Sequence, residues 1–200
     1  VLQILFRNLI LIWSSVALSL LLYYAFLREL QFTYDIQTYV KNRAAFEREM
    51  EQCESKHKNA GVFMFDLNNL KETNDVYGHK AGDEMIFDAA KTIKECFIRI
   101  GRTYRIGGDE FCVICEEISR PLAERSLANL DDLLMKANQN RQNKIVLAYG
   151  CAFYNPKESE GIYSVLSQAD GEMYVHKAKL KGLYGRRSND QRNDAVSTDI

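Results

Sequence analysis

Three carboxylates beside expected strand ends are the first candidates for chemistry in this chain. Asp66 ends the run GVFMFD, whose composition suits a buried central strand. Asp109 and Glu110 follow Gly107-Gly108, and a Gly-Gly pair between two strand-like runs indicates a hairpin. If these strands are neighbours, the carboxylates meet at one edge of a sheet. Their mutual repulsion would cost folding free energy unless a cation neutralised it.

Carboxylates gathered in this way favour phosphate chemistry assisted by a divalent cation. Mg2+ prefers oxygen ligands and leaves positions open for phosphate oxygens, and a pair of such ions can activate an attacking hydroxyl and stabilise a leaving phosphate. Gly107 and Gly108 lack a Cβ, so a nucleotide can approach their backbone. The helix expected after Asp66 offers free N–H groups for phosphates, with Lys71 one turn in. Taken alone, however, the Gly-Gly segment could be only a polar hairpin.

Alternating strands and helices must hold these groups in place. Apolar residues at helical spacing over 83–98 predict a helix that packs one face on a sheet, and Pro121 can begin another helix that reaches about Lys136. The expected class is α/β, an α+β sandwich with helices on a mostly antiparallel sheet. The other expected elements are helices over 68–76 and 162–181 and strands over 61–66, 102–106, 110–116 and 145–153, with Gly78–Gly82 separating the first helices.

Composition narrows the classes of function. The chain has 26 Lys and Arg against 27 Asp and Glu, so its net charge of -1 leaves no positive excess for broad, non-specific binding of nucleic acid. The five cysteines are scattered without metal-ligand clustering, which indicates reduced thiols. Cys112 and Cys115 form a C-x-x-C pattern, but within a strand they point to opposite faces, so we expect no redox pair.

The N-terminal segment predicts a membrane span. No charged residue occurs from Asn8 to Leu27, and at about 1.5 Å per residue this stretch can cross a hydrocarbon core of about 30 Å. Trp13 and the pair Tyr23-Tyr24 are placed as interfacial aromatic residues. A secretory signal peptide and a buried core helix are the alternatives, although no small-residue cleavage site follows the apolar stretch.

The combination of motifs is more specific than any one of them. The run RIGGDEF at 105–111 resembles the signature of the GGDEF family of diguanylate cyclases. The segment 66–83 resembles that family's first strand and the loop after it, the segment 35–46 its leading segment, and the segment 169–177 its last helix. These motifs follow one another in the family's order over about residues 35–181.

The resemblance implies a fold and a reaction. The family has the nucleotidyl-cyclase or polymerase-palm type of fold, and it condenses two molecules of GTP into cyclic di-GMP with release of pyrophosphate. Mg2+, or Mn2+ in its place, is the implied cofactor. Each subunit would hold one GTP, so the resemblance implies a homodimer of catalytic domains. Because GTP is cytosolic, it also implies a domain on the cytoplasmic side of the cell membrane.

The resemblance further implies a role for each matching residue. The implied metal ligands are the side chains of Asp66 and Asp109 and the carbonyl of Leu67. The implied catalytic residues are Asp109, which would help deprotonate the ribose 3′-hydroxyl, and Glu110, which would lie beside the metals. The implied substrate contacts are Asn74 and Asp83 with the guanine edge, Lys71, Lys177 and Lys181 with the β- and γ-phosphates, and Gly107 and Gly108 through their backbone.

The chain departs from the family pattern at several positions. Ile36, Tyr39 and Val40 replace Pro, Gly and Leu in the leading segment, which puts its turn geometry and any coupling of signals through it in question. The family's product-inhibition site is an Arg-x-x-Asp motif that ends five residues before the Gly-Gly pair. Ile98 and Gly101 hold its Arg and Asp positions, so we expect that site to be missing.

Four segments are expected along the chain. Residues 1–28 would form a transmembrane helix and its flank, 29–50 a juxtamembrane linker helix broken by a turn near 38–42, 51–182 the GGDEF domain, and 183–200 a disordered polar tail. The chain begins with Val1, so we expect it to be the C-terminal piece of a longer protein. Two functions stay open: an active cyclase anchored in the membrane, and a catalytically silent GGDEF-like domain that binds GTP or a partner. Silent members usually lose one of the acids, and all are present here.

Overall fold

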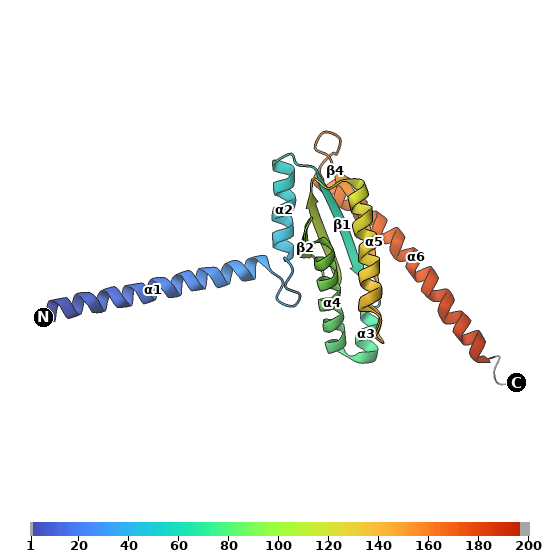
Figure 1. Ribbon diagram of the computed structural model, residues 1–200, viewed down its shortest axis with the longest axis horizontal. Coiled ribbons are helices and arrows are strands. Elements are labelled where there is room, and N and C mark those ends of the chain that lie inside the picture. Colours follow the sequence, from blue (N-terminus) through green and yellow to red (C-terminus); the bar gives the residue numbers. More distant parts are fainter. Residues whose placement is uncertain (1, 197–200) are drawn as a thin grey trace.

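The computed structural model describes residues 2–196, and its centre is an antiparallel sheet of four strands (Figure 1). The strands are β1 (Ala60–Leu67), β2 (Arg102–Arg105), β3 (Glu110–Glu116) and β4 (Leu147–Tyr154), in the order β2-β3-β1-β4. β1 pairs with both β3 and β4, so it lies in the middle of the sheet. Every residue of β1 is buried, as its continuous apolar run predicts.

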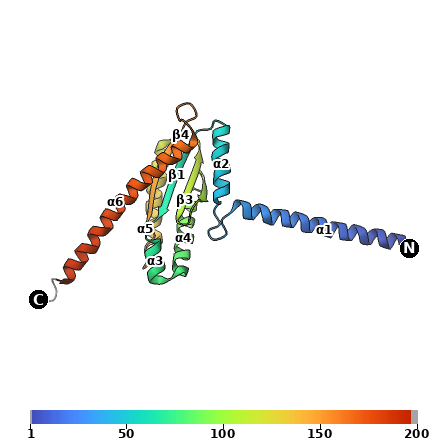
Figure 2. The ribbon, with the colours of Figure 1, turned by 180° about the vertical axis from the view of Figure 1, so that it is seen from behind.

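Helices cover both faces of the sheet. α4 (His79–Phe97) and α5 (Arg120–Ala137) pack on one face, while α2 (Arg43–Ser55) and the first part of α6 (Ile162–Val196) pack on the other (Figures 1 and 2). Alternate side chains of β1 enter the two cores, because Phe63 and Phe65 pack with α4 whereas Val62 and Met64 pack with α2 and α6. The expected class, helices on an antiparallel sheet, is confirmed.

The two cysteines of the C-x-x-C pattern lie on opposite faces of β3, as predicted. Cys112 belongs to the core beneath α2 and α6, and Cys115 to the core beneath α4. Burial raises the pKa of both thiols, that of Cys115 to about 12. Both therefore stay protonated and separated by the sheet, and they act as small apolar core residues.

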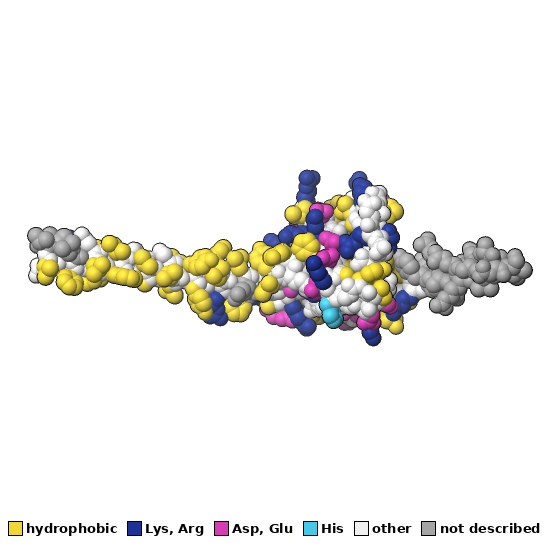
Figure 3. Space-filling model, turned by 90° about the horizontal axis from the view of Figure 1, so that it is seen from below, with side chains coloured by type: hydrophobic (Ala, Val, Ile, Leu, Met, Phe, Trp, Pro, Cys, Tyr) yellow, Lys and Arg dark blue, Asp and Glu magenta, His cyan; other side chains and the backbone are white. Residues whose placement is uncertain are grey.

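The N-terminal helix α1 (Leu2–Thr33) extends away from the globular part (Figure 1). Its segment Phe6–Leu30 has a mean hydropathy of 2.0, and none of that window is buried within the molecule. Hydrophobic side chains line α1, whereas charged side chains of both signs cover the globular part (Figure 3). The alternative of a buried core helix is therefore wrong for Phe6–Leu30, and an apolar segment of this length that the globular part leaves uncovered fits a membrane anchor.

Between α1 and α2 the chain forms a short loop, 34–42, which we call the lead-in loop. It lies against the edge strand β2, because Lys41 N donates to Thr103 O at 3.0 Å and Arg105 N donates to Lys41 O at 2.8 Å. Tyr39 takes a φ of 56°, a left-handed conformation that favours glycine. A tyrosine therefore takes here a backbone conformation that glycine adopts without penalty, at some cost in backbone strain.

Two helices differ in length from the sequence expectation. α4 begins at His79, so only Gly78 separates it from α3 (Leu70–Tyr77) and Gly82 lies inside the helix. α6 continues past Lys181 to Val196, where the sequence predicted the start of a disordered tail. The end of that expected tail, 197–200, lies outside the described residues.

Candidate active site

The strand register brings the three candidate carboxylates to one edge of the sheet. β1 and β3 are neighbours, and Asp66 lies directly opposite Glu110 in the antiparallel ladder. Leu67 N donates to Asp109 O at 2.9 Å, which holds the residue after Asp66 against the hairpin turn. The prediction that these strands adjoin is therefore confirmed. A carboxylate at the end of a buried strand and a hairpin opposite it suffice to build this acidic edge.

One carboxylate oxygen at this edge has no partner within the described part of the chain. Asp66 is only 5% exposed, and its Oδ2 accepts a hydrogen bond from Lys177 Nζ at 2.7 Å. Its Oδ1 is buried with no hydrogen bond. A buried oxygen of an ionised group without a donor is costly, which indicates that a ligand completes the site. Lys177 lies on α6, 111 residues away, and the resemblance had placed it in the site.

At this edge of the sheet, negative charge exceeds the positive charge beside it. Burial raises the pKa of Glu110, and nearby negative charges raise it further; they belong to Asp109, Asp66 and Asp170. Lys177 opposes this rise only in part. Sequence reasoning gave Asp170 no role, although its spacing of seven residues from Lys177 places both on one face of α6. The charges of three carboxylates thus raise the pKa of a fourth, Glu110, at this edge.

This edge fits a divalent cation that shares its ligands with a substrate. Asp66 Oδ1 is an unpartnered hard donor, and the surrounding acids supply uncompensated negative charge. Among the side chains that the structure describes, no three from His, Cys, Asp or Glu already form a metal cage. Mg2+ is usually bound by one or two carboxylates together with water and substrate phosphates, so a complete protein cage is not required.

The residues expected to read guanine lie on α3 and α4 beside this edge. Asn74 Oδ1 is buried without a hydrogen-bond partner in the described structure, while the Asp83 side chain is exposed. A Cβ added to Gly82 would overlap the Asn74 side chain, so Gly82 allows Asn74 to approach α4 closely. Asn68, to which the sequence gave no role, also has a buried and unpartnered amide nitrogen. Three orphaned polar atoms near the end of β1 and on α3 favour a polar ligand there.

The other two lysines that are expected to bind phosphate are exposed to solvent. Lys71 is exposed on the first turn of α3, and Lys181 is exposed on α6, four residues beyond Lys177. This spacing places Lys181 on the same face of α6 as Lys177, one turn further from Asp66. Of the expected phosphate-binding residues, the structure joins Lys177 to the acidic edge by a hydrogen bond.

Arg105 organises the glycine turn, a role that sequence reasoning missed. Its guanidinium donates to the carbonyls of Gly107 at 3.2 Å and Gly108 at 2.8 Å. It also forms an ion pair of 3.1 Å with Asp35 of the lead-in loop. Burial raises and hydrogen bonds from Thr38 and Arg105 lower the pKa of the Asp35 carboxyl, and the net direction is downward. The lead-in loop and the glycine turn are thus locked together.

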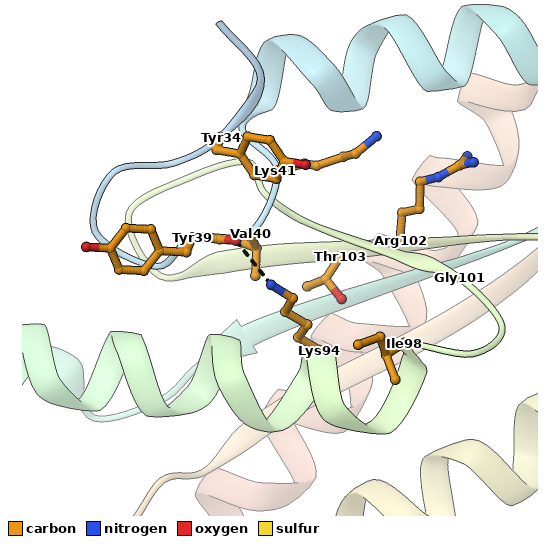
Figure 4. A pocket seen from close by; sticks show the side chains of 9 residues that line it. All are labelled: Tyr34, Tyr39, Val40, Lys41, Lys94, Ile98, Gly101, Arg102 and Thr103. Atoms are coloured by element: carbon orange, nitrogen blue, oxygen red, sulfur yellow. Dashed lines mark hydrogen bonds between the residues drawn. The ribbon is translucent and has the colours of Figure 1, made fainter. Parts of the chain in front are cut away.

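The two positions at which the sequence predicts a missing product-inhibition motif, Ile98 and Gly101, line a pocket of about 270 Å³ (Figure 4). Ile98 is exposed at its rim and offers no charge. At Gly101 an added Cβ would overlap Cys115 Sγ and lie 2.7 Å from Ile114 O, so this backbone also leaves no room for an aspartate. Arg102 contributes to the pocket, but its guanidinium is paired with Glu49 at 2.7 Å. This geometry supports the prediction that the Arg-x-x-Asp site is missing.

Known proteins resemble this chain in sequence and in fold. The family profile "Diguanylate cyclase, GGDEF domain" matches residues 32–182. The probable diguanylate cyclase DgcJ of Escherichia coli is 29% identical over 147 residues, which are 72% of this chain and 29% of that protein. Diguanylate cyclase VdcA of Vibrio cholerae is 30% identical over 141 residues, which are 68% of this chain and 41% of that protein. The chain therefore spans less than half the length of either relative.

A solved structure shows the same fold. The coiled coil and GGDEF domain of DgcB from Caulobacter crescentus, in complex with c-di-GMP, superposes with a TM-score of 0.75 at 23% identity. The match covers 83% of this chain and 91% of that one. With the profile match over most of the chain and the acidic edge in place, the chain belongs to the GGDEF domain family of diguanylate cyclases.

Proposed function

We propose that this chain condenses two molecules of GTP into cyclic di-GMP and two pyrophosphates. The observation that carries the proposal is the acidic edge, where Asp66 and Glu110 face each other across β1 and β3 and Asp66 Oδ1 lacks a partner. The relatives named diguanylate cyclases support the choice of reaction. In each of two successive steps a ribose 3′-oxygen bonds to the α-phosphorus of the other GTP, the bond from that phosphorus to the β-phosphate oxygen breaks, and pyrophosphate leaves.

Residues of the acidic edge would hold Mg2+ and the triphosphate. Asp66, Asp109 and the Leu67 carbonyl would supply the ligands, and the bound ion would neutralise charge developing on the phosphates. Asp109 would accept the 3′-hydroxyl proton, while Glu110, whose pKa is raised, would complete the negative environment beside the metal. Lys177 now neutralises Asp66; its long, flexible stem would let the ammonium move to the β- and γ-phosphates when these arrive, joined by Lys71 and Lys181.

Base selection would belong to α3 and α4. The amide of Asn74 and the carboxylate of Asp83 can together pair with the donors and acceptors of the guanine edge. The turn at Gly107 and Gly108, held by Arg105, would let the nucleotide lie close to the backbone. Because one domain would hold one GTP, the reaction requires a homodimer in which two sites face each other. Anchoring by α1 would place both domains on the cytoplasmic side of one membrane, where GTP is found.

Substitution of the metal-binding carboxylates tests this proposal. The full chain, reconstituted in lipid nanodiscs with GTP and Mg2+, should form cyclic di-GMP identified by mass spectrometry. Asp66→Asn and Asp109→Asn should abolish turnover while thermal unfolding stays close to that of the unaltered chain. Asp132→Asn, an exposed carboxylate on α5, is the matched control and should retain activity. Full activity in either site variant would contradict the metal assignment, and binding of GTP without any product would identify a silent, GTP-binding domain instead.

A further inference from the structure

A glutamine of the lead-in loop joins the glycine turn to the helix expected to read the base. Gln37 Nε2 donates to Asp83 Oδ1 at 2.8 Å, and Gln37 Oε1 accepts from Arg105 Nη1 at 2.6 Å. Arg105 offers only donors, and an ionised carboxylate offers only acceptors. These two neighbours therefore permit a single orientation of the Gln37 amide, with its oxygen toward Arg105 and its nitrogen toward Asp83.

The two hydrogen bonds of Gln37 form a bridge between Arg105 and Asp83, and these two residues differ in how firmly they are held. The Arg105 side chain is only 13% exposed, and it also bonds to Asp35 and to the carbonyls of the glycine turn. Asp83 is exposed on α4, and the hydrogen bond from Gln37 reaches it from 46 residues away. The anchored guanidinium thus restrains the amide, and the amide restrains an otherwise exposed carboxylate.

We infer that Gln37 is a positioning residue that holds the Asp83 carboxylate in the orientation for binding guanine. The inference rests on the proposed function, which assigns the guanine edge to Asp83. Each carboxylate oxygen has more than one acceptor site, so Oδ1 can bind Gln37 while Oδ2 stays open to the donors of the base. A carboxylate already fixed loses less rotational freedom when the base binds, and this preorganisation favours affinity.

The expected consequence is base selectivity. Guanine presents N1–H and an exocyclic amino group, whereas hypoxanthine, the base of ITP, presents N1–H alone. A well-oriented carboxylate can accept from both guanine donors, but a freely rotating one loses part of that advantage. Loss of the bridge should therefore weaken binding of the guanine nucleotide more than binding of the hypoxanthine nucleotide.

Two substitutions separate positioning of Asp83 from support of the glycine turn. Gln37→Glu keeps an acceptor for Arg105, but it removes the donor to Asp83 and places a like charge beside it. Gln37→Leu removes both hydrogen bonds. Gln52→Glu and Gln52→Leu on α2, where the native amide contacts Lys56, are the matched controls. Because Gln37→Glu retains the contact with Arg105, it also serves if Gln37→Leu fails to fold.

Equilibrium titration of the full chain in nanodiscs measures the effect without turnover. The probes are 3′-deoxy-GTP and 3′-deoxy-ITP, which lack the hydroxyl that would attack. Both Gln37 variants should lower the preference for the guanine nucleotide about ten-fold, the loss of one hydrogen bond to a charged group. The Gln52 variants should leave the preference unchanged. In an Asp83→Ala background the Gln37 variants should produce no further loss, because residues that act through one contact are not additive.

The outcomes distinguish this inference from the proposed function. An unchanged preference in folded Gln37 variants that bind the guanine nucleotide overturns the positioning role. An equal loss for both nucleotides also overturns it, because that result indicates only structural support. A selective loss in a chain that makes no cyclic di-GMP supports the positioning role and overturns the proposed reaction. A chain that binds neither nucleotide overturns both.

Discussion

Replacing Gly82 with alanine should separate fold stability from guanine recognition. Gly82 lies inside α4, where alanine favours a helix over glycine by about 0.5–1 kcal/mol. The added Cβ would overlap the Asn74 side-chain oxygen and lie 3.2 Å from Leu70 Cδ1. Because the amide is the free end of a side chain, it can rotate away, so the helix survives and Asn74 is displaced. We expect the free energy of unfolding to stay within about 1 kcal/mol of the unaltered value.

Binding, by contrast, should weaken when Asn74 is displaced. One net hydrogen bond is worth about 1 kcal/mol, which corresponds to an affinity for 3′-deoxy-GTP lower by roughly five-fold. Urea unfolding and calorimetric titration of the same preparation measure the two quantities. Gly171→Ala in α6, where an added Cβ meets no atom within 4 Å, is the control for helix propensity alone. A stable Gly82→Ala variant with undiminished affinity would refute the reasoning, as would further loss on adding Asn74→Ala.

Three other expected outcomes follow from single observations. Added cyclic di-GMP should inhibit turnover weakly or not at all, because Ile98 lacks the guanidinium that would bind it. Strong non-competitive inhibition that is abolished by Arg102→Ala would show instead that a shifted product site acts. The pKa of Asp35 is lowered in the folded chain, so its contribution to stability is present above the ordinary value of 3.8 and is lost as pH falls through the lower folded value. The difference in unfolding free energy between the unaltered chain and Asp35→Asn should therefore shrink as the pH falls below 3.8, and a constant difference would contradict this. A reporter fused after Lys181 should be active only in the cytoplasm, and activity solely outside it would overturn the proposed orientation and the enzyme assignment together.

Local patterns in the sequence determined the elements and the acidic edge. The apolar runs before Asp66 and within β3 each predicted a strand, and the Gly-Gly pair placed the turn between β2 and β3. The opposite placement of Cys112 and Cys115 followed from the period of a strand alone. These features could be read because each depends on the spacing of residues close together in the chain. Lys177, which contacts Asp66 from 111 residues away, was predicted in the site only by the resemblance to the GGDEF family.

Other features depend on contacts between distant segments, and only the tertiary structure decided them. Arg105 donates a hydrogen bond to Asp35 of the lead-in loop, 70 residues away in sequence. Gln37 donates one to Asp83, 46 residues away, and no local pattern predicts either pair. The influence of Asp170 on the acidic edge likewise requires α6 to lie against β4 and β1. The close approach of Asn74 to the bare Cα of Gly82 likewise requires α3 and α4 to pack against each other. Hydrophobic spacing selects which face of an element is buried, but side-chain pairing across elements arises only when packing sets their separation and register.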